Sequence, residues 1–167
     1  MKRIFCVFCL ALALCLALSS CALVAPRPKI KEAEFNFSVT CEIDGEEKTL
    51  SGVYVCEYEG TAFALDIGRY RVWNGYVKGG EDELLGITVG EDGGRVDVNL
   101  DFYPEYFMSD SNKWGRAEPE PNLSVHLENE EGLRILYDAD EIAQVYGAKI
   151  IGYQYDKPIE NSFGIFG

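Results

Sequence analysis

Histidine is nearly absent from this 167-residue chain, which has one, and basic side chains are few. The chain has 15 Lys and Arg residues against 28 Asp and Glu residues, and its formal net charge is −13. Polyanions repel so acidic a chain, so nucleic acid is excluded as an expected partner. No phosphate-binding loop, metal-ligand cluster or nucleophile elbow is found, and no cofactor or metal is expected. These absences favour a protein that is not an enzyme.

Apolar residues form one uninterrupted run, Ile4 to Leu18, near the amino terminus. Lys2 and Arg3 precede the run, and Leu18-Ser19-Ser20-Cys21 closes it. A basic start, a short apolar stretch and small residues before a cleavage point are typical of a signal peptide. The run is too short for a comfortable membrane span.

The closing tetrapeptide resembles the lipobox of bacterial lipoproteins. In that family a diacylglyceryl group is attached to the cysteine thiol, and a peptidase then cuts just before it. The resemblance implies that Cys21 is a lipid anchor on the outer face of the cytoplasmic membrane, and that residues 1–20 are removed. Two alternatives stay open, an uncleaved anchor and an ordinary secretory cut after Ala22.

Removal of residues 1–20 leaves 147 residues, enough for one hydrophobic core. Residues 21–33 are expected to form a flexible tether that reaches at most about 40 Å, and residues 34–167 a single domain. The tether is basic through Arg27, Lys29 and Lys31, whereas the domain is acidic. Because an anionic leaflet attracts the tether and repels the body, the domain is expected to stand away from the membrane.

Alternation of apolar and polar residues predicts a mainly β domain. Strands are expected at 35–43, 49–58, 63–67 and 149–155, and hairpins at 85–102 and 123–137. The stretch 69–77 fits a strand or one face of a helix, and we favour the strand. The connections are too short for parallel crossovers, so we expect an antiparallel β-sandwich or open barrel.

One short helix is predicted near the carboxyl end. Asp138 and Glu141 have the spacing of a capping box, and Ile142, Val145 and Tyr146 share one face. Gly147 can supply the left-handed stop.

Cys41 and Cys56 are the two cysteines that follow Cys21. An oxidising compartment favours a disulfide between them. If Ile43 opposes Lys48 across the Asp44-Gly45 turn, however, Cys56 faces Phe35, about 20 Å from Cys41 and beyond disulfide reach. A disulfide and two buried thiols both stay open.

Residues 103–121 lack periodicity and lie between two strands. Long irregular connections are either functional or disordered, and the aromatic content here indicates packing. Trp114, Tyr106 and Tyr103 are therefore candidate ligand-binding residues, and Trp73, Tyr70 and Arg71 form a second candidate cluster. Stacking faces with nearby donors suit a glycan, a peptide or an envelope protein. If a ligand site exists, we expect it to involve this connection.

Three stretches resemble recurring landmarks of small surface lipoproteins of Gram-positive gut bacteria. They are Val55-Cys56-Glu57-Tyr58, Arg69 to Trp73 and Pro104 to Met108. The resemblance carries no catalytic residue to this chain.

His126 shares a strand face with Ser124 and Glu128, and it is expected to be solvated rather than catalytic. The acidic runs coincide with turns or the helix cap and lack the ligand order of a calcium loop. We favour a non-catalytic binding or envelope-assembly module. The alternative is an extracytoplasmic hydrolase of envelope glycans or peptides that uses paired carboxylates.

Overall fold

The computed structural model describes residues 26–66, 68–79, 83–89, 94–110, 118–129 and 132–164. For residues 83–89, 128, 129 and 132 it describes the backbone alone. The strands are β1 (Arg27–Pro28), β2 (Glu32–Ile43), β3 (Glu46–Ala64), β4 (Gly68–Val77), β5 (Glu83–Val89), β6 (Gly94–Leu100), β7 (Pro121–Asn129), β8 (Gly132–Leu136), β9 (Ala148–Tyr155) and β10 (Phe163–Gly164). The helices are α2 (Pro104–Phe107) and α3 (Ala139–Tyr146).

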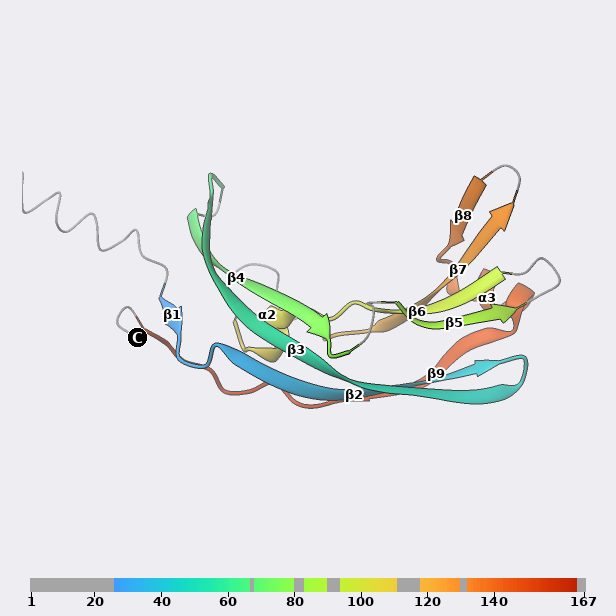
Figure 1. Ribbon diagram of the computed structural model, residues 1–167, viewed down its shortest axis with the longest axis horizontal. Coiled ribbons are helices and arrows are strands. Elements are labelled where there is room, and N and C mark those ends of the chain that lie inside the picture. The colour runs from blue at the N-terminus through green and yellow to red at the C-terminus, as the bar shows by residue number, and fades with distance from the viewer. Residues whose placement is uncertain are drawn as a thin grey trace, which may run out of the picture.

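Two four-stranded antiparallel sheets make up most of the described chain. The first has the order β4-β3-β2-β9 and curls along its length, and the second has the order β5-β6-β7-β8 (Figure 1). The second sheet and α3 lie over one half of the curled sheet, and α2 lies over the other half (Figure 1). A two-stranded ribbon, β1-β10, joins segments from near both ends of the chain. The expectation of a mainly β, antiparallel fold with a short helix near the carboxyl end is confirmed.

The β2–β3 hairpin turns through two residues. Asp44 and Gly45 both have positive φ, 52° and 80°, as a tight turn between twisted strands requires. Ile43 therefore pairs with Glu46, and the predicted pairing of Ile43 with Lys48 is wrong by two residues. The predicted pairing implies a four-residue turn from Asp44 to Glu47, whereas Asp44 and Gly45 alone make the turn.

β3 is one strand of 19 residues, where two strands were predicted. It continues through a register shift between Tyr58 and Gly60, where the φ of Gly60 is 139°. Such a bulge bends a strand without ending it. β4 is a strand, as we favoured, and the predicted hairpins β5–β6 and β7–β8 form.

The predicted helix cap is confirmed at both ends of α3. Asp138 accepts a hydrogen bond from the Glu141 backbone at 2.8 Å, and Gly147 ends the helix with φ 58°. The backbone of Asp44 in turn donates to the Gly147 carbonyl. Helix α3 is thereby fastened to the β2–β3 turn.

The predicted tether is too long, because residues 26–33 belong to the fold. Lys29 and Ile30 donate backbone hydrogen bonds to Ser162 and to the side chain of Asn161, and the Lys31 carbonyl accepts from Tyr58. Pro28 is buried, and β2 begins at Glu32. The domain therefore begins by Pro26 rather than at residue 34.

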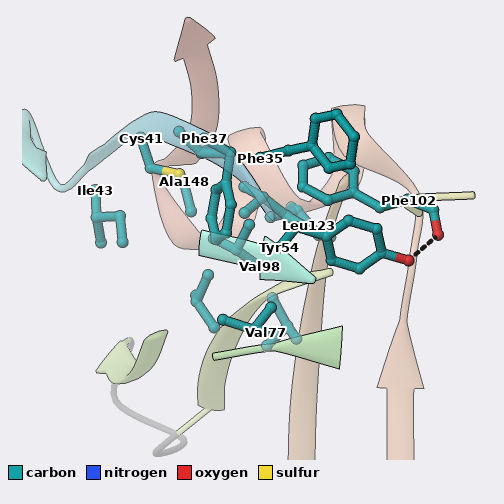
Figure 2. Packing of buried hydrophobic residues seen from close by; sticks show 14 of the residues in the cluster. Phe35, Phe37, Cys41, Ile43, Tyr54, Val77, Val98, Phe102, Leu123 and Ala148 are labelled. Atoms are coloured by element: carbon teal, nitrogen blue, oxygen red, sulfur yellow. Dashed lines mark hydrogen bonds between the residues drawn. The ribbon is translucent and has the colours of Figure 1, made fainter. Parts of the chain in front are cut away.

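One apolar cluster joins both sheets to the helices. Figure 2 shows Phe37 of β2 in one cluster with Val98 of β6 and Leu123 of β7, Cys41 beside Ala148 of β9, and the Tyr54 hydroxyl donating to the Phe102 carbonyl. Each large side chain that is fully buried contributes roughly 1.5–3 kcal/mol. Gly75 of β4 lets the Tyr54 ring and α2 approach closely, because a Cβ there would meet Tyr54 and Pro104.

Cys41 and Cys56 are free thiols, and no disulfide joins them. In the observed register Cys56 pairs with Ala33, eight residues along β2 from Cys41. That separation is about 26 Å at ~3.3 Å per residue, far beyond disulfide geometry. Burial raises the pKa of Cys41, and burial followed by the charge of Glu105 raises that of Cys56 to about 12.

We predict that neither thiol reacts with iodoacetamide in the folded protein. At pH 8 a pKa of about 12 leaves roughly one Cys56 thiolate in ten thousand, and both side chains are buried. Intact mass spectrometry should find both thiols unmodified in buffer and both alkylated in denaturant. A mass two hydrogens lower, with no alkylation in denaturant, would instead reveal a disulfide.

Candidate functional site

An open groove of about 770 Å³ lies beside the carboxyl end of β9, an edge strand of the curled sheet. Three segments that are distant in sequence contribute to it: α2, the chain just before β7, and β9 with the residues after it. Its lining residues are Tyr106, Glu118, Tyr153, Gln154, Tyr155, Lys157 and Pro158. Aromatic faces and polar groups together form the wall.

Tyr153 and Tyr155 form an aromatic platform in this groove. Alternate residues of a strand point to the same face, so the two rings stack with centroids 6.1 Å apart and an interplanar angle of 14°. Tyr106 meets Tyr155 edge to face at 6.2 Å. Tyr155 packs against the core, whereas Tyr153 is 42% exposed. The exposed ring is available to a ligand.

Glu118 is fixed at the wall of the groove by a hydrogen bond from the Tyr155 hydroxyl at 2.6 Å. Partial burial, followed by this hydrogen bond, raises the pKa of Tyr155. The hydroxyl therefore stays protonated and keeps donating to the carboxylate.

A second, acidic pocket of about 370 Å³ shares Glu118 with the groove. Its other lining residues are Asp101, Tyr103 and Glu120. Asn122 donates to Asp101 at 2.6 Å, and the Tyr103 ring is 46% exposed. Glu118 thus stands between an aromatic groove and a pocket with three carboxylates.

Two of the predicted candidates from the 103–121 connection line these pockets. Tyr106 lines the aromatic groove, Tyr103 lines the acidic pocket, and Glu118 of the same connection lines both. The described part of this connection packs as expected, since Phe107 and Met108 are buried. Trp114 lies outside the described residues.

Arg71 and Trp73 are structural, and their prediction as ligand-binding residues is wrong. Arg71 donates through Nε and Nη2 to the two carboxylate oxygens of Asp110, each at 2.5 Å, and Trp73 Nε1 donates to the same carboxylate at 2.8 Å. The side chains of Arg71 and Asp110 are 8% and 0% exposed. A buried charge that already has its partners has nothing to offer a ligand.

The predicted second cluster is also divided between two faces. Tyr70 and Arg71 are neighbours on β4, opposite Ala62 and Thr61 of β3, so their side chains point to opposite faces of the sheet. Tyr70 therefore lies on the other side of the sheet from Arg71 and Trp73. The linear sequence placed these residues together, and the pleat separates them.

His126 lies in a polar cluster on the second sheet, and this strand face is less solvated than predicted. His126 Nε2 is 3.6 Å from an oxygen of Asp97, which is fully buried and also accepts from Arg95. Ser124 is fully buried as well and accepts from Asn99. A substrate cannot reach the Ser124 hydroxyl, so these residues do not form a nucleophilic triad.

Glu105 of α2 is the one described carboxyl group with a clearly shifted proton affinity. Burial, and then the charge of Asp110, raise its pKa above the usual value. Its neighbours are the structural Asp110 and the buried thiol of Cys56. The two pockets that meet at Glu118 are lined by other residues, so this carboxyl group is not placed for catalysis there.

The described residues contain no group of three or more His, Cys, Asp or Glu side chains arranged to hold a metal ion. Within the same part of the chain, no helix is both long enough and apolar enough to span a membrane.

Six groove residues were not among the predicted site residues: Glu118, Tyr153, Gln154, Tyr155, Lys157 and Pro158. Tyr153 and Tyr155 carried a usable signal, because two aromatics spaced by two in a predicted strand must share a face. Glu118 carried only its place in the 103–121 connection, and Lys157 carried no signal. The positions of Glu118 and Lys157 depend on the path of the irregular chain before β7 and after β9.

We predict that Asp110→Asn lowers the free energy of unfolding by about 3–5 kcal/mol, because it leaves Arg71 buried without its charge partner. Urea denaturation measures the loss. The matched control is Glu34→Gln, which breaks an exposed 2.7 Å pair with Lys78 and should cost less than about 1 kcal/mol. Equal losses in the two variants would show that the Arg71–Asp110 pair is not structural.

Comparisons of the chain with protein-family models, with curated proteins and with solved structures each found no match. Its function therefore has to be inferred from its own residues and geometry.

Proposed function

We propose that the protein is a non-catalytic binding module, held by a lipid on Cys21 at the outer face of the bacterial cytoplasmic membrane. The basic start, the apolar run and Leu18-Ser19-Ser20-Cys21 support the anchor. The exposed ring of Tyr153, stacked on Tyr155 in an open groove, carries the proposal of binding.

The ligand that best suits this groove is a glycan. Sugar rings pack their C–H faces on exposed aromatic rings, and Tyr153 offers such a face. Glu118, Gln154 and Lys157 surround it with hydrogen-bonding groups of both kinds. A peptide with an aromatic or apolar side chain, or a segment of an envelope protein, is the other ligand class that this lining admits.

The anchor predicts a diacylglyceryl group on Cys21 as the first residue of the mature protein. Mass spectrometry of the amino-terminal peptide from native membranes should find this mass. Cys21→Ser should abolish the diacylglyceryl modification, release or mislocalise the protein, and leave its melting temperature unchanged. An intact Met1, or an unmodified terminus at Leu23, would refute the anchor.

The groove predicts that Tyr153→Ala weakens glycan binding about two- to tenfold, since one aromatic contact is worth roughly 0.5–1.5 kcal/mol. An oligosaccharide array followed by calorimetry with soluble peptidoglycan fragments measures it. The matched control is Tyr137→Ala, which removes a 66% exposed ring outside the groove lining and should bind normally. Equal affinity of the two variants would exclude stacking on Tyr153.

The second candidate is an extracytoplasmic hydrolase of envelope glycans or peptides. The observation that favours it is the acidic pocket, where Asp101, Glu118 and Glu120 gather beside the aromatic groove. Glycoside hydrolases usually have two carboxyl groups that flank the glycosidic bond to be cut. Release of reducing ends from purified envelope glycan by the wild-type protein, lost in Glu118→Gln and Glu120→Gln, would establish the enzyme and overturn the binding module.

A further inference from the structure

We propose that one end of this domain, which we call the basal end, lies directly on an anionic lipid bilayer. The basal end comprises the turn between β3 and β4 and the β1–β10 ribbon. The inference rests on the proposed anchor and adds a lipid-binding surface and a fixed orientation to it. Three features lie toward this end of the long axis: the exit of the amino-terminal chain, a basic groove and an exposed apolar turn.

The exit of the chain sets how far the domain can be from the bilayer. The Pro26 carbonyl accepts a hydrogen bond from Arg71 Nη1 at 3.1 Å, so the fold already holds the chain at Pro26. Five peptide units separate Pro26 from Cys21 and span at most about 17 Å when fully extended. The anchor therefore keeps the basal end at the membrane surface, and the expectation of a domain standing well away is withdrawn.

A basic groove of about 470 Å³ opens at this exit. Arg27, Lys29 and Lys31 line it together with the Phe163 ring, and all three basic side chains are exposed. Anionic headgroups attract each basic side chain held near the surface, which strengthens binding roughly fivefold per residue.

The turn between β3 and β4 presents apolar side chains at the same end. Leu65 is 96% exposed and Phe63 is 60% exposed, which is uncommon for large apolar residues placed together. Arg71 of β4 connects the strand that follows this turn to the chain exit. Its guanidinium contacts Pro26 and lies 4.1 Å over the Phe163 ring. The turn is about five residues along β4 from Arg71, or roughly 17 Å. Figure 1 shows this turn, β1 and the carboxyl-terminal segment at one end of the long axis.

Lipid is the occupant that suits all three features together. An apolar turn enters the headgroup region while neighbouring cations pair with phosphates, as in interfacial anchors. Acidic residues also flank this surface: Asp66 in the turn, Glu160 before β10, and the exposed Glu32 and Glu59 beside Lys31, so the three cations only partly determine its charge. The opposite end carries exposed acidic residues of the β2–β3 turn and α3, which an anionic membrane repels: Asp44, Glu46, Glu47, Asp138, Asp140 and Glu141. The charge distribution thus favours the same orientation as the anchor.

The test uses the full lipidated protein on vesicles of phosphatidylglycerol and phosphatidylcholine. An environment-sensitive fluorophore is attached at Leu65→Cys at the basal end or at Glu47→Cys at the opposite end. Cys41 and Cys56 stay unlabelled because they are buried. We expect the label at position 65 to shift to shorter wavelength and to be quenched by spin-labelled lipid. The label at position 47 should behave as it does in water.

The charge variant Arg27→Gln/Lys29→Gln/Lys31→Gln should lose most of the quenching at position 65. The matched variant Lys48→Gln/Arg134→Gln/Lys149→Gln removes as many charges from the opposite half and should keep it. Mass spectrometry of the same preparation reports the acyl group. A lipidated protein whose label at position 65 stays aqueous overturns the basal surface and leaves the anchor standing. A missing acyl group overturns both. A label that is protected by a bound protein but not by vesicles would identify a protein partner and overturn the lipid.

Discussion

The buried pair of Arg71 and Asp110 holds together parts of the chain that the sheets alone would leave apart. Asp110 follows α2, Arg71 and Trp73 lie on β4, and the same guanidinium reaches Pro26 and the Phe163 ring. Two fully desolvated charges stabilise a fold only when every donor and acceptor has a partner. Here the Asp110 carboxylate accepts hydrogen bonds from Arg71 and Trp73 of β4. These bonds hold α2 against β4, and the contacts of Arg71 hold the two terminal segments at the same place.

The aromatic groove beside β9 depends on where α2 is held. Helix α2 is only four residues long, too short to hold itself, and it is kept in place by Phe107 against Phe35 and by the close approach at Gly75. Tyr106 on this helix then meets Tyr155 at the edge of the curled sheet. The Arg71–Asp110 pair and the packing of Phe107 and Gly75 thus act together to hold the helix that carries Tyr106.

The strands and the capped helix were predictable because their signals are local. Alternation along β2, the turn chemistry of Asp44-Gly45 and the capping of α3 each depend on a few neighbouring residues. The site was harder to predict. Tyr103 and Tyr106 were proposed because of their irregular connection and both line candidate pockets, but Arg71 looked like a ligand residue because its partner, Asp110, is 39 positions away. Glu118 and Tyr155 likewise meet only after two sheets and a helix are placed. Pairings across that distance leave no trace in one sequence.

The β1–β10 ribbon gives the molecule a mechanical property. A pull on the amino-terminal chain enters the fold at Pro26, where it meets the hydrogen bond from Arg71, then a ribbon of two residue pairs and the hydrogen bonds of Lys29 and Ile30 to the 161–162 segment. Only after these yield does tension reach the twelve-pair ladder of β2 and β3. The ribbon therefore separates at a lower force than the β2–β3 ladder, which bears the load after it. Stretching would free residues 26–31. The aromatic groove beside β9, which none of these residues lines, would keep its shape.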